Sequence, residues 1–153
     1  MTESSTHLVG VAVPTLRQLR SAVLSSTSPD AAVAALREAG FAGGAAVYSA
    51  FEEWLAERGV TDTSSGKNAA GELSLEEFGN GTTQFFRDSG WGDVTLSHDD
   101  DEGVAIVDIE KCWEGSISAA DAPGCHITTG LLAAFFGQIA GYPVAVLETE
   151  CCE

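Results

Sequence analysis

The chain has 153 residues, 44% of them hydrophobic and 8% aromatic, which is typical of one globular domain. Acidic residues outnumber basic ones 23 to 7, and the formal net charge of -16 repels nucleic-acid backbones and anionic lipid surfaces. The longest apolar run is shorter than the roughly 20 residues of a membrane span, and no basic residue precedes the short apolar stretch near the start, as a secretory signal requires. We therefore expect a cytoplasmic protein that binds neither nucleic acid nor membrane.

The acidity itself has two interpretations. A dense carboxylate surface with only two lysines, Lys67 and Lys111, suits a protein kept soluble in concentrated salt, where self-repulsion is screened within a few Å. The alternative is a functional acidic patch, and we favour the halophile-like habitat. The run from Asp99 to Glu102 lacks the spaced ligands and central glycine of a calcium loop, so it is predicted to be the solvated tip of a hairpin.

The first half of the chain has helical patterning. Residues 1–13 are expected to form a tail or a short strand, ahead of a single domain over 14–153. Pro14 suits the first turn of a helix, and the Ser25 to Ser28 cluster ends it. The apolar positions at helical spacing in this segment are Leu16, Leu19, Val23 and Leu24.

A second, longer helical segment follows. Ser28 before Pro29 is an N-cap signal, and helical composition continues from Ala31 and then from Phe41 as far as Gly59. The pair Gly43-Gly44 marks either a kink or a place where another backbone packs closely. Residues 60–72 have the composition of a loop.

A third helix is expected after that loop, because Ser74 and Glu77 have the spacing of a capping box. The helix has one apolar side and should end near Gly90. The members of that apolar side are Leu75, Phe78, Thr82, Phe85 and Phe86.

Beyond Gly90 the apolar period changes from helical to alternating. Strands are predicted over 91–97 and 103–110, joined as an antiparallel hairpin, and a helix rich in small residues should run from Cys125 or His126 to Ala140. A last strand is predicted from Tyr142 to Glu150, with Val144, Val146 and Glu148 on one face. The fold class is α+β: a helical N-terminal half packed on a small antiparallel sheet, with a glycine-rich helix inserted before the last strand.

Three segments, FFRDSGWGDVTL, VAIVDIEKCWEGSIS and GCHITTGLLAAFFGQIAGYPVAVLETECC, follow one another in an order that resembles the 4-vinyl reductase domain. The helical stretch ALREAGFAGGAAVYSAF is also similar to that family, so the resemblance covers most of the chain. Such domains are related to subunits of vesicle-transport particles and serve in bacteria and archaea as hydrocarbon sensors. The resemblance implies a domain that binds a small, mostly apolar molecule.

The resemblance also implies a metal. Phenol-sensing members of the family hold a structural zinc through a Cys at the start of the glycine-rich helix, a Glu-x-x-Cys at the end of the closing strand and a further Cys. In this chain, three of these ligand positions are occupied by Cys125, Glu148 and Cys151, and Cys152 is the candidate for the missing fourth ligand. Thiolates and a carboxylate suit tetrahedral Zn²⁺. The alternatives are reduced, partly buried thiols, or a vicinal disulfide between Cys151 and Cys152.

The aromatic residues indicate where a ligand would bind. They gather in the helical half, and the resemblance implies a pocket between these helices and the sheet, although aromatic stripes at helical spacing also form ordinary cores. The candidate pocket residues are Phe41, Tyr48, Phe51, Trp54, Phe85 and Trp91.

No pattern in the chain indicates catalysis. His126 adjoins Cys125, but neighbours in a helix point about 100° apart, so the two do not form a nucleophile and base, and Cys112 beside Trp113 suits a core or pocket wall. The sequence therefore predicts a non-catalytic ligand-sensing domain acting as a homodimer or with a partner protein. The alternatives are an assembly adaptor of the vesicle-particle type and an accessory factor in tetrapyrrole reduction.

Overall fold

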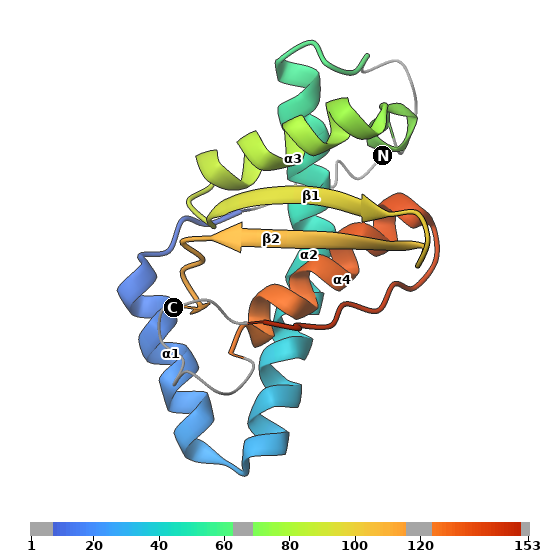
Figure 1. The fold of residues 1–153 in the computed structure, drawn as a ribbon. Helices are drawn as coiled ribbons and strands as arrows, with labels where there is room; N and C mark the ends of the chain where they lie inside the picture. The colour runs from blue at the N-terminus through green and yellow to red at the C-terminus, as the bar shows by residue number, and fades with distance from the viewer. Residues whose placement is uncertain (1–7, 63–68, 116–123, 151–153) are drawn as a thin grey trace.

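The computed structural model describes residues 8–62, 69–115 and 124–150, and over these ranges the chain has an α+β fold (Figure 1). Four α-helices and one antiparallel hairpin are formed in this part of the chain. The elements in order are α1 (Val13–Ser26), α2 (Pro29–Glu57), a short 3-10 helix η1 (Ala69–Glu72), α3 (Leu75–Asp88), β1 (Asp93–Asp99), β2 (Val104–Glu110) and α4 (His126–Ala140).

Local sequence signals account for three of the helix ends. Pro14 lies in the first turn of α1, as predicted. Both halves of the capping box form at α3, where the Glu77 backbone N–H donates to Ser74 Oγ over 3.2 Å and the Ser74 N–H donates to Glu77 Oε2 over 3.0 Å. Gly141 ends α4 in the left-handed conformation, at φ 73°. These ends follow from side chains within one turn of the boundary.

The second helical segment forms one continuous helix, α2, from Pro29 to Glu57. Of the two interpretations of Gly43-Gly44, close packing applies to Gly44, where an added Cβ would overlap Ala134 Cβ of α4, whereas Gly43 has open space around it. Gly40 lies against the backbone of Ile127 in the same way. Because these glycines have no side chain, the backbones of α2 and α4 are in direct contact where the two helices cross.

The core lies where α2, α3 and α4 meet the hairpin. Phe51 and Phe135 are fully buried at its centre, with ring centroids 5.5 Å apart. Edge-to-face contacts extend the cluster, since Phe86 lies 5.4 Å from Phe135 and Phe85 lies 5.3 Å from Phe51. Aromatic pairs in this arrangement contribute beyond their buried area. The cluster anchors α4, whose start carries the polar site described below.

The hairpin covers one side of this core, with β1 packed beside α3 (Figure 1). Val94 pairs with Ile109 and Leu96 with Val107, and these four side chains pack against the core. Val104 and Ile106 point the other way and remain 43% and 46% exposed. The predicted first strand begins two residues late, at Asp93, because Gly92 has a φ of 149° and belongs to the turn.

The last predicted strand, Tyr142 to Glu150, is wrong. Residues 142–150 are extended but pair with no strand in the described ranges. The alternation is present, since Val144, Val146 and Glu148 are half-buried and their neighbours exposed. The segment lies beside α2 and α4 and follows α4 back toward its start (Figure 1). Burial of one face therefore does not require a sheet; a groove between helices provides it.

None of the helices in residues 8–62, 69–115 and 124–150 combines the length and apolar composition that a bilayer crossing needs.

Candidate functional site at the start of helix α4

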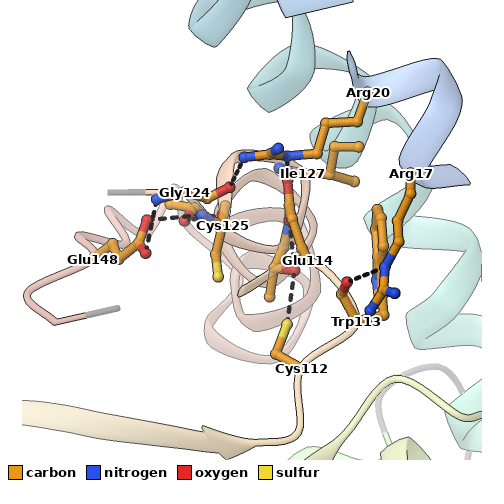
Figure 2. Close-up of polar contacts among 11 residues, drawn as sticks. Arg17, Arg20, Cys112, Trp113, Glu114, Gly124, Cys125, Ile127 and Glu148 are labelled. Atoms are coloured by element: carbon orange, nitrogen blue, oxygen red, sulfur yellow. Dashed lines mark hydrogen bonds and ion pairs between the residues drawn. The ribbon is translucent and has the colours of Figure 1, made fainter. Parts of the chain in front are cut away.

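A fully buried carboxylate, that of Glu114, lies at the start of α4 (Figure 2). It accepts hydrogen bonds from the backbone N–H groups of Ile127 and Thr128 over 2.9 and 2.8 Å, and from Thr128 Oγ1 over 2.8 Å. The first N–H groups of a helix have no partner inside the helix, and the helix dipole favours a negative charge there. Glu114 therefore caps α4 from a position 13 residues upstream.

Arg20 of α1 provides the counter-charge. Its Nε lies 3.4 Å from Glu114 Oε1, and its Nη2 donates to the carbonyl oxygen of Gly124 over 2.7 Å. The side chain is only 6% exposed. Nearby, Arg17 Nε donates to the carbonyl oxygen of Trp113 over 3.3 Å. Two arginines of α1 thus connect the first helix to the turn before α4.

The sequence interpretation missed this pair. One signal was present: Arg20 is four residues after Leu16 and three before Val23, so it lies on the apolar stripe of its helix. A charged residue within an apolar stripe needs a buried partner. Nothing in the sequence identifies that partner as Glu114, since the two residues are 94 positions apart.

Glu148 approaches the start of α4 from the other side (Figure 2). Its Oε1 and Oε2 accept the backbone N–H groups of Gly124 and Cys125 over 3.1 and 3.0 Å. Of the four predicted zinc ligands, the structure therefore places Glu148 against the backbone of Cys125. Cys151 and Cys152 lie outside the described residues. Within residues 8–62, 69–115 and 124–150, no three His, Cys, Asp or Glu side chains converge in a metal-binding arrangement.

Cys112, which the sequence assigned to a core or pocket wall, is a neighbour of Cys125. A hydrogen bond from the Cys125 thiol lowers the pKa of Cys112 from 9.0 to about 6, with further donors in the backbone of Glu114 and Gly115 and in the Thr128 hydroxyl. Cys112 Sγ lies 3.7 Å from Thr128 Oγ1. The start of α4 thus holds two neighbouring sulfur atoms among several hydrogen-bond donors.

His126 is the first residue of α4 and is 7% exposed. Its Nδ1 is buried and has no hydrogen-bond partner in the part of the chain that the structure describes. Burial lowers the pKa of the imidazole; the nearby charges of Glu114 and Glu148 raise it, and those of Arg20 and Arg37 lower it further. The neutral form is therefore favoured, and the geometry pairs His126 with neither cysteine as an acid-base couple.

A groove of about 430 Å³ lies between α2, α4 and the segment 144–147. Its walls are mainly apolar, and one exposed aromatic ring, Phe41, stands at its edge. The lining residues are Arg37, Glu38 and Phe41 of α2, Thr129, Gly130 and Ala133 of α4, and Val144 to Leu147 of the last segment.

The six predicted pocket residues separate into two groups. Phe41 lines the groove and is 58% exposed. The other five, Tyr48, Phe51, Trp54, Phe85 and Trp91, belong to the aromatic core or pack against it. Contacts among them are ring contacts, such as Phe51 with Trp54 at 6.3 Å. In this structure the aromatic stripe of α2 forms core, and the groove lies on another side of the same helix.

Comparison with known proteins adds no relative. No protein-family model, no curated protein and no solved structure matches the chain. The 4-vinyl reductase resemblance therefore remains a prediction from the sequence segments alone.

Proposed function

We propose that this chain is a binding domain for small hydrophobic or aromatic molecules, which acts as a sensor without catalysing a reaction. The observation that carries the proposal is the groove beside α4. Its volume of about 430 Å³ lies within the roughly 300–1,000 Å³ range of small-molecule sites. Its walls offer methyl groups from Ala133, Val144 and Val146 together with one aromatic ring.

The groove connects to elements through which a bound state would be transmitted. One wall is the segment 144–147, which is followed directly by Glu148, whose carboxylate is bound to Gly124 and Cys125. A ligand that shifts Val146 or Leu147 would change the position of this carboxylate at the start of α4. Partner proteins, or a second copy of the chain, would then read the change at the surface.

Binding can be measured with a neutral fluorescent probe, N-phenyl-1-naphthylamine, which increases in emission in an apolar site. We expect saturable binding to the wild-type protein and a higher melting temperature with probe, by mass action. Phe41→Ala should weaken binding at little cost in stability because the ring is 58% exposed, and Ala133→Trp should abolish binding by filling the groove.

The matched control is Leu75→Ala, which removes another exposed apolar side chain (77% exposed) at the start of α3, away from the groove. It should leave probe binding unchanged. Saturable binding that Phe41→Ala and Ala133→Trp leave intact would place the ligand elsewhere and contradict the proposal for this groove.

The second candidate function is an assembly adaptor, and one observation favours it. Val104 and Ile106 of β2 expose apolar side chains on the outer face of the hairpin. By contrast, two of the small residues of α4 are already used, since Gly130 packs against the backbone of Arg37 and Ala134 against Gly44. A homodimer or partner complex would therefore use the hairpin rather than α4.

Native mass spectrometry of the Ile106→Asp variant distinguishes the two functions. If the variant no longer assembles but still binds the fluorescent probe, the adaptor surface is separate from the groove.

A structural zinc is part of the proposal. The Glu148 carboxylate is bound to the backbone of Cys125 at the start of α4, and a thiolate and a carboxylate suit Zn²⁺, which favours four tetrahedral ligands. Both Glu148 oxygens already accept a backbone N–H, so this carboxylate is oriented with or without metal. Bound zinc would join the start of α4 to the end of the chain.

Metal analysis of protein purified without chelator under reducing conditions should give close to one zinc per chain. Cys125→Ser should lose the metal and lower the melting temperature, because binding free energy contributes to folding at such sites. Cys112→Ser identifies the remaining ligands: it keeps the zinc if the C-terminal thiols complete the site and loses it if Cys112 is a ligand. Wild-type protein without zinc would contradict the metal proposal.

A further inference from the structure

One cation that lines the groove, Arg37, has no partner among the described residues. Among the basic residues within the described ranges, Arg37 is the exception, because the others each donate to a carboxylate or a carbonyl. Arg58 pairs with the Asp88 carboxylate over 3.2 Å. Arg87 and Lys111 both pair with the Asp93 carboxylate, over 2.6 and 3.2 Å. Arg17 donates to the carbonyl oxygen of Trp113, and Arg20 pairs with Glu114.

Arg37 is half-buried on α2 and lines the groove. Its Nε is buried and has no hydrogen-bond partner within residues 8–62, 69–115 and 124–150. A buried donor without a partner costs free energy, and more so when it belongs to a charged group. In a protein whose acidic residues outnumber its basic ones 23 to 7, an arginine without a carboxylate partner is unexpected.

The other charged residue of the groove wall, Glu38, does not satisfy this donor. Neighbouring residues in a helix project about 100° apart, and Glu38 is exposed. The Glu148 carboxylate is engaged by Gly124 and Cys125. The guanidinium therefore stands at an apolar wall formed by Phe41, Ala133 and Val146, with no anion from the described chain beside it.

We propose that the groove binds an amphipathic anion: a small carboxylate-bearing molecule whose acid group pairs with Arg37 and whose apolar chain or ring lies on Phe41, Ala133 and Val146. This proposal rests on the proposed binding function and specifies its ligand class. A planar guanidinium forms paired hydrogen bonds with a carboxylate. The apolar wall would bind the hydrocarbon part of the ligand, because this contact removes hydrocarbon from water.

The overall charge of -16 opposes the approach of an anion. Whether the anion binds depends on how this long-range repulsion compares with the short-range attraction to Arg37. At physiological ionic strength exposed charges are screened beyond about 8 Å, which removes most of the repulsion from remote carboxylates. A contact with a half-buried guanidinium is screened much less. The local pair therefore dominates once the ligand is in the groove.

The test compares octanoate with octan-1-ol, which share an eight-carbon chain and differ in charge, by calorimetric titration at physiological ionic strength. We expect octanoate to bind the wild-type protein more tightly. Arg37→Gln should weaken octanoate binding by about tenfold or more, as loss of a charge-assisted hydrogen bond predicts, and leave octan-1-ol binding unchanged. Arg37→Lys should keep part of the preference, because it retains the charge and loses the planar fork.

Arg87→Gln is the matched control, since it makes the net charge more negative by the same amount on an exposed part of α3, and it should leave both affinities unchanged. Equal wild-type affinities for the two probes, or an equal loss of both in Arg37→Gln, would overturn the anion proposal while the binding function stands. If neither probe binds the wild-type protein, and N-phenyl-1-naphthylamine does not bind either, both proposals fail.

Discussion

Glu114→Ala is expected to lower the free energy of unfolding by about 3–5 kcal/mol, the cost of breaking a buried ion pair from one side. The carboxylate is fully buried and accepts from Ile127, Thr128 and Arg20. Its removal leaves a 6% exposed guanidinium without a counter-charge and two N–H groups of α4 without a cap. Chemical denaturation of the variant and the wild type measures the difference.

A double-mutant cycle separates the two roles of Glu114. The double variant Arg20→Met/Glu114→Leu should lose less unfolding free energy than the sum of the losses in the two single variants, because it leaves no uncompensated charge. It should remain less stable than the wild type, since the N–H groups of Ile127 and Thr128 would still lack an acceptor. Glu110→Gln, which removes an exposed carboxylate at the end of β2, is the control and should change little. A loss below about 1 kcal/mol in Glu114→Ala, within the range of an exposed ion pair, would show that the pair does not hold α4 in place.

The second large effect is expected at the crossing of α2 and α4. A Cβ at Gly40 would overlap the carbonyl oxygen of Ile127, while Gly43, three residues along the same helix, has open space around it. Alanine raises helix propensity by up to about 1 kcal/mol at either position. Gly43→Ala should therefore stabilise the protein. Gly40→Ala should lower its stability by about 1–3 kcal/mol, the usual cost of overpacking, because two backbones must separate.

Thermal unfolding of the two alanine variants measures this contrast, and the comparison cancels the propensity term since both positions lie in one helix. Equal melting temperatures would mean that α2 and α4 do not cross at backbone distance. Gly130→Ala, on the opposite helix, provides a second check, because a Cβ there would overlap the carbonyl oxygen of Arg37, and it should resemble Gly40→Ala.

Several features of the fold could be predicted from the sequence because they depend on neighbouring residues. The start of α3 follows from Ser74 and Glu77, and the end of α4 from Gly141, which adopts positive φ without a Cβ penalty. The inward face of β1 follows from the alternation of Val94 and Leu96. Each of these signals acts within one helical turn or one strand.

The candidate site could be predicted only in part. The resemblance predicts Cys125 and Glu148 as ligands, and the Glu148 carboxylate accepts the backbone N–H of Cys125. The sequence does not single out Arg20, Glu114 or Arg37. Their significance lies in having or lacking a partner from a distant segment, which no local spacing encodes.

Local patterns in the sequence predict where helices are capped, which strand face is apolar, and that one face of residues 142–150 turns away from water. What each of these faces packs against depends on the tertiary structure. It placed Val144 and Val146 in a groove between helices instead of a sheet, paired Arg20 with a carboxylate 94 residues away, and left Arg37 without an anion from the described chain. The physical reason is that alternation and periodicity report only which side chains avoid water, whereas the choice of partner depends on how α1, α2 and α4 pack.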